Sequence, residues 1–178
     1  MKKWKLTLLA AAVMLMLAAC GDEPAQTNGD NPSEGTQQQT PEGKVDGYVF
    51  VYNGVTISVD ELMQTVLDQL GEPLTVYEAP SCAFDGVDKI YTYSSVEIQT
   101  YPAEDGDRIS MIVLKDDMVS TPEQVSLFGY EGDITDAYGE NYTEENGMRV
   151  YTKGGMKLRF ILEGGEIVSI EYVSTVLD

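Results

Sequence analysis

Histidine is absent from this chain of 178 residues, and cysteine occurs only twice, at Cys20 and Cys82. Without histidine, neither a Ser–His–Asp triad nor a Cys–His pair can form, and histidine-ligated zinc is excluded. Two cysteines are also too few for a cysteine-rich metal site. The sequence therefore predicts no catalytic residues of these kinds, no bound metal and no cofactor.

Positive charge is scarce as well, because 11 Lys and Arg stand against 30 Asp and Glu. Nucleic-acid affinity comes largely from basic side chains that neutralise phosphates, so we expect no nucleic-acid partner. The same charge repels anionic lipid head groups. Basic proteins or cations are the partners that such a chain attracts.

The N-terminus has the three parts of a secretory signal peptide over residues 1–19. Three lysines among the first five residues precede a run, residues 6–17, that is apolar apart from one threonine. This run is shorter than the roughly 20 residues that a membrane-spanning helix needs. It leads into Leu17-Ala18-Ala19-Cys20, which resembles the lipobox of bacterial lipoproteins. The resemblance implies cleavage before Cys20 and a diacylglycerol lipid on that cysteine, whereas a plain secreted protein is the alternative.

Lipidation of Cys20 has consequences for the rest of the chain. Cys82 becomes the remaining thiol, so no disulfide forms within the chain. Removal of the signal leaves eight bases and 30 acids, hence a net charge of 8 − 30 = −22. Residues 20–45 are polar, with almost no apolar side chain to bury, and are expected to form a disordered tether. We therefore expect the protein on the extracytoplasmic face of the cell membrane, held by its lipid alone.

A folded region is predicted from residue 46 onwards, beginning with a hairpin and a helix. The hairpin, residues 48–57, turns at Asn53-Gly54, because a type I′ turn needs positive φ at both central residues. Apolar residues at helical spacing then predict a helix over 59–70. Ser58 and Glu61, three positions apart, have the pattern of a capping box at its start.

Three strands follow this helix, and the same order of elements then repeats. The predicted strands are 90–93, 96–101 and 109–114 in the first copy and, after a short helix that ends at Gly139, 148–152, 156–162 and 167–173 in the second. We therefore predict an α+β fold of two tandem αβββ modules, residues 46–116 and 117–178. The antiparallel sheets would each have a helix packed on one face.

The second module resembles a known family. The order of its Tyr138-Gly139, Phe160, Gly164-Gly165 and Ile170 is similar to that of the αβββ module of small outer-membrane assembly lipoproteins. In tandem, the modules resemble the β-lactamase inhibitory protein, which implies two such modules forming a concave sheet. The chain departs from that inhibitor because it lacks its disulfides and has a predicted lipid anchor. The whole chain also resembles uncharacterised lipoproteins of Gram-positive anaerobes, a likeness that implies no activity.

Period-2 alternation assigns a core face and a polar face to the predicted strands. The predicted core face comprises Val96, Ile98, Thr100, Ile109, Met111 and Val113 in the first module, and Met156, Leu158, Phe160, Val168, Ile170 and Tyr172 in the second. The polar face comprises Glu97, Gln99, Tyr101, Lys157, Arg159 and Glu171. These six polar-face residues are the candidate binding surface for another extracytoplasmic protein.

A second candidate site lies in the loop of about residues 72–89, which is longer than its counterpart in the second module. It contains Cys82, Asp85, Asp88 and Lys89. A reactive cysteine needs a nearby cation to lower its thiol pKa, and Lys89 is the one close candidate. The alternative is a small apolar side chain in the core, where free cysteine is often found. Binding of a small ligand or a cation near this loop is an alternative function of the chain.

The sequence thus favours a non-enzymatic binding or regulatory module over an enzyme. An envelope hydrolase that uses an Asp/Glu pair is the alternative, because 30 acids offer many pairs although none stands out. No acidic run matches the calcium-binding loop of an EF-hand. No pattern in the sequence specifies an oligomeric state.

Overall fold

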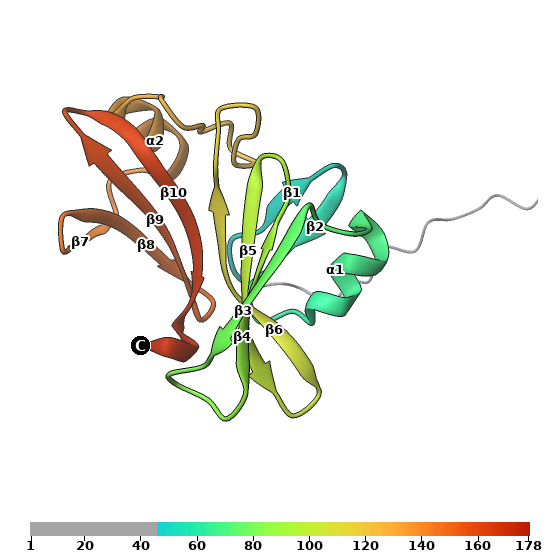
Figure 1. Cartoon of the computed structure of the whole chain (residues 1–178). Helices are drawn as coiled ribbons and strands as arrows, with labels where there is room; N and C mark the ends of the chain where they lie inside the picture. The colour runs from blue at the N-terminus through green and yellow to red at the C-terminus, as the bar shows by residue number, and fades with distance from the viewer. Residues whose placement is uncertain (1–45) are drawn as a thin grey trace, which may run out of the picture. The chain divides into compact units, whose positions relative to one another are not determined.

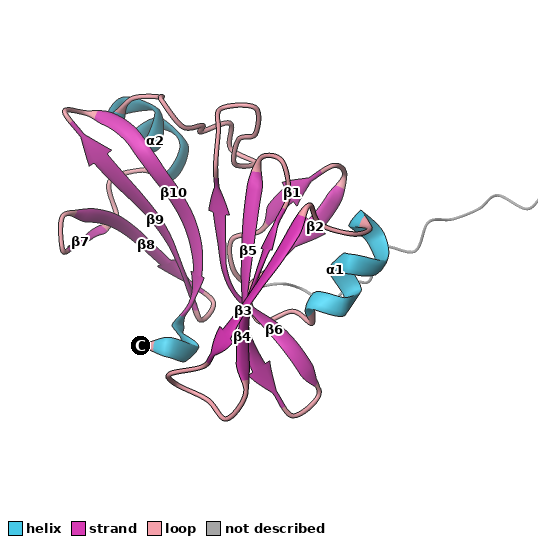
Figure 2. Ribbon diagram, in the orientation of Figure 1, coloured by secondary structure: helices cyan, strands magenta, loops and turns pink. Residues whose placement is uncertain are grey.

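Two antiparallel sheets and two α-helices make up residues 46–178, the part of the chain that the computed structural model describes (Figures 1 and 2). The predicted signal peptide, Cys20 and the predicted tether lie outside the described residues. Within residues 46–178, neither helix is long and apolar enough to cross a membrane. The fold is mixed α+β, as predicted.

The described chain begins with the predicted hairpin. Strand β1 (Phe50–Tyr52) pairs antiparallel with β2 (Val55–Ile57). Asn53 and Gly54 have φ values of 49° and 81°, both in the left-handed region that a type I′ turn requires. The Asn-Gly signal therefore predicted both the hairpin and the backbone conformation of its turn.

Helix α1 (Met63–Leu70) begins four residues later than the sequence pattern predicted. Asp60 has a φ of 63°, which no α-helix accommodates, and its N–H donates to the carbonyl oxygen of Ile109 at 2.7 Å. Leu62 forms a β-bridge with Arg108. The chain between β2 and α1 is therefore hydrogen-bonded to a strand of the large sheet. Half of the predicted capping box remains, since the Ser58 N–H donates to Glu61 Oε2 at 3.3 Å.

The larger sheet has eight antiparallel strands in the order β3-β4-β5-β6-β10-β9-β8-β7. They are β3 (Thr75–Pro80), β4 (Val87–Thr92), β5 (Val96–Ala103), β6 (Gly106–Leu114), β7 (Thr143–Glu145), β8 (Met148–Lys153), β9 (Met156–Glu163) and β10 (Glu166–Ser174). Strand β10 pairs with β6, so the two predicted sheets are one continuous sheet. The edge strands β3 and β7 were missed, because both lie in segments that were interpreted as loops.

The helices and the small sheet pack on one face of the large sheet, called the core face here. The Phe50 ring of β1 lies 5.7 Å from that of Tyr172, between centroids, and the Tyr138 ring of helix α2 (Glu131–Tyr138) lies 5.5 Å from that of Phe160. Val66 of α1 is fully buried. The predicted helix packing is therefore present, with both helices on the same sheet.

A β-bulge on the last strand of each hairpin pair changes which residues face the core. Ser110 in β6 and Val168 in β10 have no cross-strand partner in the register. Beyond an unpaired residue, the side chains that would have faced the core face the opposite side of the sheet, and the reverse. Ile112 is therefore buried, whereas Met111 and Val113 are only partly buried and lie on the opposite face. The prediction was wrong for Met111, Val113 and Val168, because strict alternation ignores the bulges.

Candidate binding site on the open sheet face

The face of the large sheet opposite the core face, called the open face here, carries the polar residues singled out by the sequence. Glu97 lies opposite Val113, which lies opposite Glu171, which lies opposite Arg159. This row crosses four adjacent strands, β5, β6, β10 and β9. Lys157 lies two residues before Arg159 on β9 and shares its face. The pairing of β6 with β10 thus makes one surface from residues of both predicted modules.

Three charged side chains of the open face, those of Lys157, Arg159 and Glu171, are paired within the chain. Arg159 Nε lies 3.4 Å from Glu171 Oε2, and these two side chains are only 20% and 18% exposed. Lys157 Nζ lies 3.1 Å from Glu145 Oε2 and 3.0 Å from Asp178 Oδ2. Hydrogen bonds to these two carboxylates raise the pKa of Lys157. The open face therefore presents both positive and negative side chains that lie close to one another.

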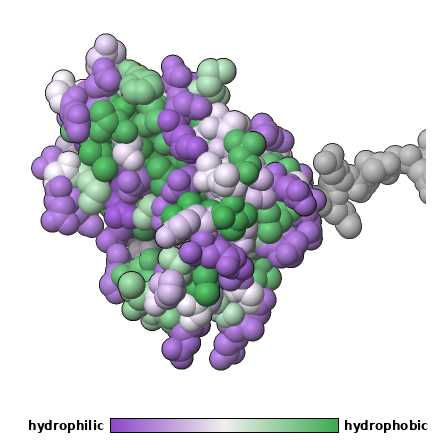
Figure 3. Space-filling view, in the orientation of Figure 1, coloured by the Kyte–Doolittle hydropathy of each residue, from purple (hydrophilic) through white to green (hydrophobic). Residues whose placement is uncertain are grey.

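Apolar side chains lie between the polar residues of β5 and the charged residues of β10 and β9. Met111 and Val113 of β6 lie on the open face between Gln99 and Glu97 of β5 and the β10 strand. Both are partly exposed. The Gln99 Nε2 donates to Glu97 Oε1 at 3.0 Å. Figure 3 shows hydrophobic residues interspersed with hydrophilic ones on the face of the molecule in view.

Tyr101, the third candidate on β5, is not free for contact, because it is only 8% exposed. The ring of Phe84 stacks on it at 5.0 Å between centroids. Its hydroxyl donates to Asp60 Oδ1 at 3.1 Å, and burial raises its pKa. Phe84 belongs to the turn between β3 and β4, so Tyr101 holds this turn against the sheet.

The candidate loop of the sequence is the tip of the β3–β4 hairpin, and its residues separate. Cys82 and Asp85 are exposed in the turn, so the interpretation of Cys82 as a buried residue was wrong. Asp88 and Lys89 lie on β4. Lys89 Nζ lies 2.9 Å from Asp107 Oδ2, and this hydrogen bond raises the pKa of Lys89. The cation that was to activate the thiol is therefore already paired.

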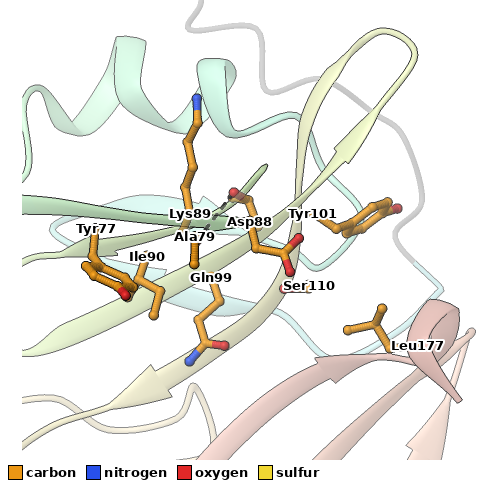
Figure 4. A pocket seen from close by; sticks show the side chains of 10 residues that line it. Tyr77, Ala79, Asp88, Lys89, Ile90, Gln99, Tyr101, Ser110 and Leu177 are labelled. Atoms are coloured by element: carbon orange, nitrogen blue, oxygen red, sulfur yellow. Dashed lines mark hydrogen bonds between the residues drawn. The ribbon is translucent and has the colours of Figure 1, made fainter. Parts of the chain in front are cut away.

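A pocket of about 220 Å³ lies where the two candidate sets meet (Figure 4). Its walls include Gln99 and Tyr101 from the polar-face set, and Asp88 and Lys89 from the loop set. The other lining residues are Tyr77, Ala79, Ile90, Thr100, Ser110 and Leu177. Leu177 comes from the short 3-10 helix η1 (Thr175–Leu177) that follows β10. The pocket therefore combines four strands of the first half with the C-terminus.

Asp88 provides the carboxylate of this pocket. In Figure 4 its carboxylate points toward the side on which Leu177 lies, whereas Lys89 extends in the opposite direction. Its Oδ1 is buried and has no hydrogen-bond partner among residues 46–178. Asp88 is also the one acid among the lining residues, so the pocket does not present the two carboxylates that a glycosidase needs. No group of three or more His, Cys, Asp or Glu among the described residues is arranged to hold a metal ion.

Sequence reasoning missed three parts of this pocket. Tyr77 belongs to β3, whose Thr75-Val76-Tyr77 run lies between Pro73 and Pro80, a strand signal that was available. Ser110 lines the pocket because it lies at the β6 bulge, and no local sequence pattern predicts that bulge. No sequence pattern marks Leu177 as a pocket residue, because it reaches the pocket only through the path of the chain after β10.

Comparison with known proteins adds nothing to these observations. No model of a protein family, no curated protein and no solved structure matches the chain.

Proposed function

We propose that this chain is a lipid-anchored protein of the extracytoplasmic membrane face that binds another extracytoplasmic protein through its open face, without catalysis. The observation that carries the proposal is the row from Glu97 through Val113 and Glu171 to Arg159, which crosses β5, β6, β10 and β9. A row that spans both halves of the sheet offers one surface for one partner.

The composition of the open face suits a protein partner. Met111 and Val113 supply an apolar centre on β6. Polar side chains of β5 lie on one side of it, and the charged side chains of β9 and β10 lie on the other. Protein interfaces combine an apolar centre with a polar rim in this way. Residues 46–178 contain seven bases and 25 acids, a balance of −18, so electrostatic complementarity favours a basic partner.

We infer that the described region consists of two tandem modules in which a helix precedes four strands, β3–β6 in the first and β7–β10 in the second, one strand more than the predicted αβββ order. In the first half, Tyr91 pairs with Ile98, which pairs with Ile112. The residues 60 positions later pair likewise, namely Tyr151, Leu158 and Tyr172. Each helix also ends at a glycine whose carbonyl oxygen accepts a tyrosine hydroxyl, from Tyr93 in the turn after β4 and from Tyr151 in β8. These shared features favour duplication of one module.

The proposed location rests on the N-terminal sequence. A positive start, a short apolar run and Leu17-Ala18-Ala19-Cys20 support export and lipidation of Cys20. The polar residues that follow would act as a spacer between the lipid and the folded region. Such a spacer would leave the open face accessible to proteins near the membrane.

A crosslinked pull-down of the full chain from intact cells, read by mass spectrometry, tests the binding proposal. The test variant is Arg159→Glu, which places a like charge beside Glu171 and reverses one element of the row. Lys115→Glu is the matched control, because Lys115 is exposed, follows the end of β6 and receives the same change of charge. We expect one dominant envelope protein with the unaltered chain and the control, and its loss with Arg159→Glu.

A charge swap separates binding from folding. Arg159→Glu combined with Glu171→Arg retains an ion pair but inverts the pattern that a partner meets. We expect this variant to unfold at the same urea concentration as the unaltered chain and still to lose the partner. Capture of the same protein by the folded swap variant would refute the open face as the binding surface.

A further inference from the structure

The Asp88 carboxylate is the unsatisfied group of the open-face pocket. Its Oδ1 is buried and without a hydrogen-bond partner in the described part of the chain. A buried carboxylate oxygen without a partner costs free energy. The adjacent cation does not relieve it, because Lys89 extends away from the pocket to Asp107 and Glu78. The pocket therefore has an acceptor for a positively charged donor, and the ammonium group of its lining residue Lys89 is paired with Asp107 instead.

The walls around Asp88 determine the shape of donor that fits. Ile90 and Leu177 are apolar, and Tyr77 adds an aromatic ring. Gln99 and Ser110 bring further oxygen acceptors to the same space. An ammonium group has three N–H donors and no acceptor, so several oxygens can share it, and aromatic faces attract it as well. A short alkyl chain behind the ammonium group matches the apolar walls.

Other ligand classes fit this pocket less well. Calcium and magnesium require several oxygen ligands of high charge density, and Asp88 is the one carboxylate among the residues lining the pocket. Anions are disfavoured by that carboxylate and by the charge of −19 over the chain. A volume of about 220 Å³ has room for roughly seven groups the size of water, which is enough for a butylammonium ion.

We propose that the pocket beside Asp88 binds an alkylammonium group. The group has two possible sources, a free small amine and the lysine side chain of a protein that covers the open face. The proposal goes beyond the binding function above, because a free amine can occupy the pocket whether or not a protein covers the sheet. Asp88 receives the ammonium N–H donors, and Ile90 and Leu177 contact the alkyl chain.

Titration of the full chain with n-butylammonium chloride, followed by the NMR shifts of backbone amides around the pocket, tests the proposal. We expect saturable binding with a Kd on the order of 1–10 mM, as suits a ligand of this size. The neutral analogue 1-butanol should bind at least tenfold more weakly. Equal binding of 1-butanol and n-butylammonium would overturn the proposal, as would the absence of any saturable shift.

Two variants assign the binding to Asp88. Asp88→Asn should weaken n-butylammonium binding at least tenfold, because the amide carries no charge. Asp85→Asn is the matched control, since Asp85 lies three residues away on the same hairpin but is exposed in the turn, and it should bind as the unaltered chain does. Leu177→Gln provides a second probe at an exposed C-terminal position, where unfolding is not expected, and should weaken binding several-fold. Unchanged affinity in a folded Asp88→Asn variant would refute the site.

A peptide with one lysine, acetyl-Gly-Lys-Gly-amide, distinguishes the two sources. Shifts of the same pocket amides by the peptide and by n-butylammonium would support a partner's lysine as the natural occupant. Shifts with n-butylammonium alone would support a free amine, and shifts with neither would overturn the proposal. Arg159→Glu should leave n-butylammonium binding unchanged, so failure of the protein-binding proposal is distinguishable from failure of this one.

Discussion

Ser174 donates its hydroxyl to Asp60 Oδ1 at 2.7 Å, across 114 positions of sequence. The same carboxylate oxygen accepts the Tyr101 hydroxyl at 3.1 Å, and the Arg108 guanidinium donates to the Asp60 backbone carbonyl oxygen. Asp60 thus connects the chain before α1 with strands β5, β6 and β10. These contacts tie the two halves of the described region together at one residue.

Replacement of Asp60 should therefore destabilise the fold to a degree that depends on the new side chain. Asp60→Ala removes two hydrogen bonds to a charged acceptor, each of about 1.5–3 kcal/mol. It also places alanine at a φ of 63°, in the left-handed region that Asp and Asn tolerate better than alanine does. We expect a loss of at least about 3 kcal/mol in urea unfolding, and a clearly smaller loss for Asp60→Asn, which keeps an acceptor oxygen and tolerates this φ. Equal losses for both variants would contradict this account.

The tyrosine hydroxyls that cap the helices are a second test of stability. Tyr151 donates to the Gly139 carbonyl oxygen at 2.6 Å, and Tyr93 donates to that of Gly71 at 3.0 Å. Removal of either hydroxyl leaves a helix-terminal carbonyl without this donor, so Tyr151→Phe and Tyr93→Phe should each cost about 1–2 kcal/mol in urea unfolding. The control is Tyr77→Phe, at an exposed position, where we expect a change within about 0.5 kcal/mol. A similar cost at all three positions would show that the helix caps contribute nothing specific.

Glu61 predicts a pH dependence of a particular sign. Burial raises the pKa of its carboxyl above the ordinary 4.5, and the hydrogen bond from the Ser58 N–H partly opposes the shift. Because the carboxyl pKa is higher in the folded chain than in the unfolded chain, Glu61 adds to the free energy of unfolding at low pH. This contribution is complete below the unfolded pKa of 4.5 and is lost as pH rises through the folded pKa. Glu61→Gln retains an acceptor for Ser58 and cannot ionise.

The measurement compares the unfolding free energies of the unaltered chain and Glu61→Gln at about pH 4 and about pH 7. The difference in unfolding free energy between the two proteins reports the titration of Glu61 alone, because every other acid titrates in both. We expect the glutamine variant to gain relative to the unaltered chain as pH rises. A difference that is the same at both pH values would show that Glu61 titrates alike in the folded and unfolded chain.

The fold was predictable from the sequence wherever a local pattern determines the structure. The turn at Asn53-Gly54 needs only its own two residues, and Gly71 ends α1 with a φ of 78° as a helix-terminal glycine does. The start of α1 was misplaced because backbone hydrogen bonds between residues 60–61 and Ile109, 49 positions after Asp60, prevent a helical conformation there. Long-range pairing of this kind leaves no local signal.

The candidate site was predictable only in part, for the same reason. The alternation that groups Glu97 with Gln99 and Lys157 with Arg159 is local, so the shared face of each strand pair followed from the sequence. The pairing of β6 with β10 is not local, and it turns two polar faces into one. The pocket depends further on the bulge at Ser110 and on Leu177, and neither position differs in sequence from an ordinary strand or C-terminus.

The exposed thiol of Cys82 allows the proposed location and the structure of the β3–β4 turn to be tested together. Cys82 is a free, exposed cysteine, whereas a thioether on Cys20 would leave no thiol there. A membrane-impermeant maleimide applied to intact cells should therefore label one cysteine per chain at Cys82. Cys82→Ala should abolish the labelling and change stability by no more than about 0.5 kcal/mol, because an exposed turn position contributes little packing.

The outcomes of this labelling separate the two claims. Labelling that requires lysis of the cells but not denaturation would place the folded region inside the cell and refute the proposed location. Labelling that requires denaturant even after lysis would instead show a buried thiol and refute the exposed turn. Two labelled cysteines in the chain purified from the envelope would show that Cys20 carries a free thiol, and the anchor would then need another explanation. One label on intact cells requires both an extracytoplasmic turn and its exposure, because either one alone would leave Cys82 out of reach.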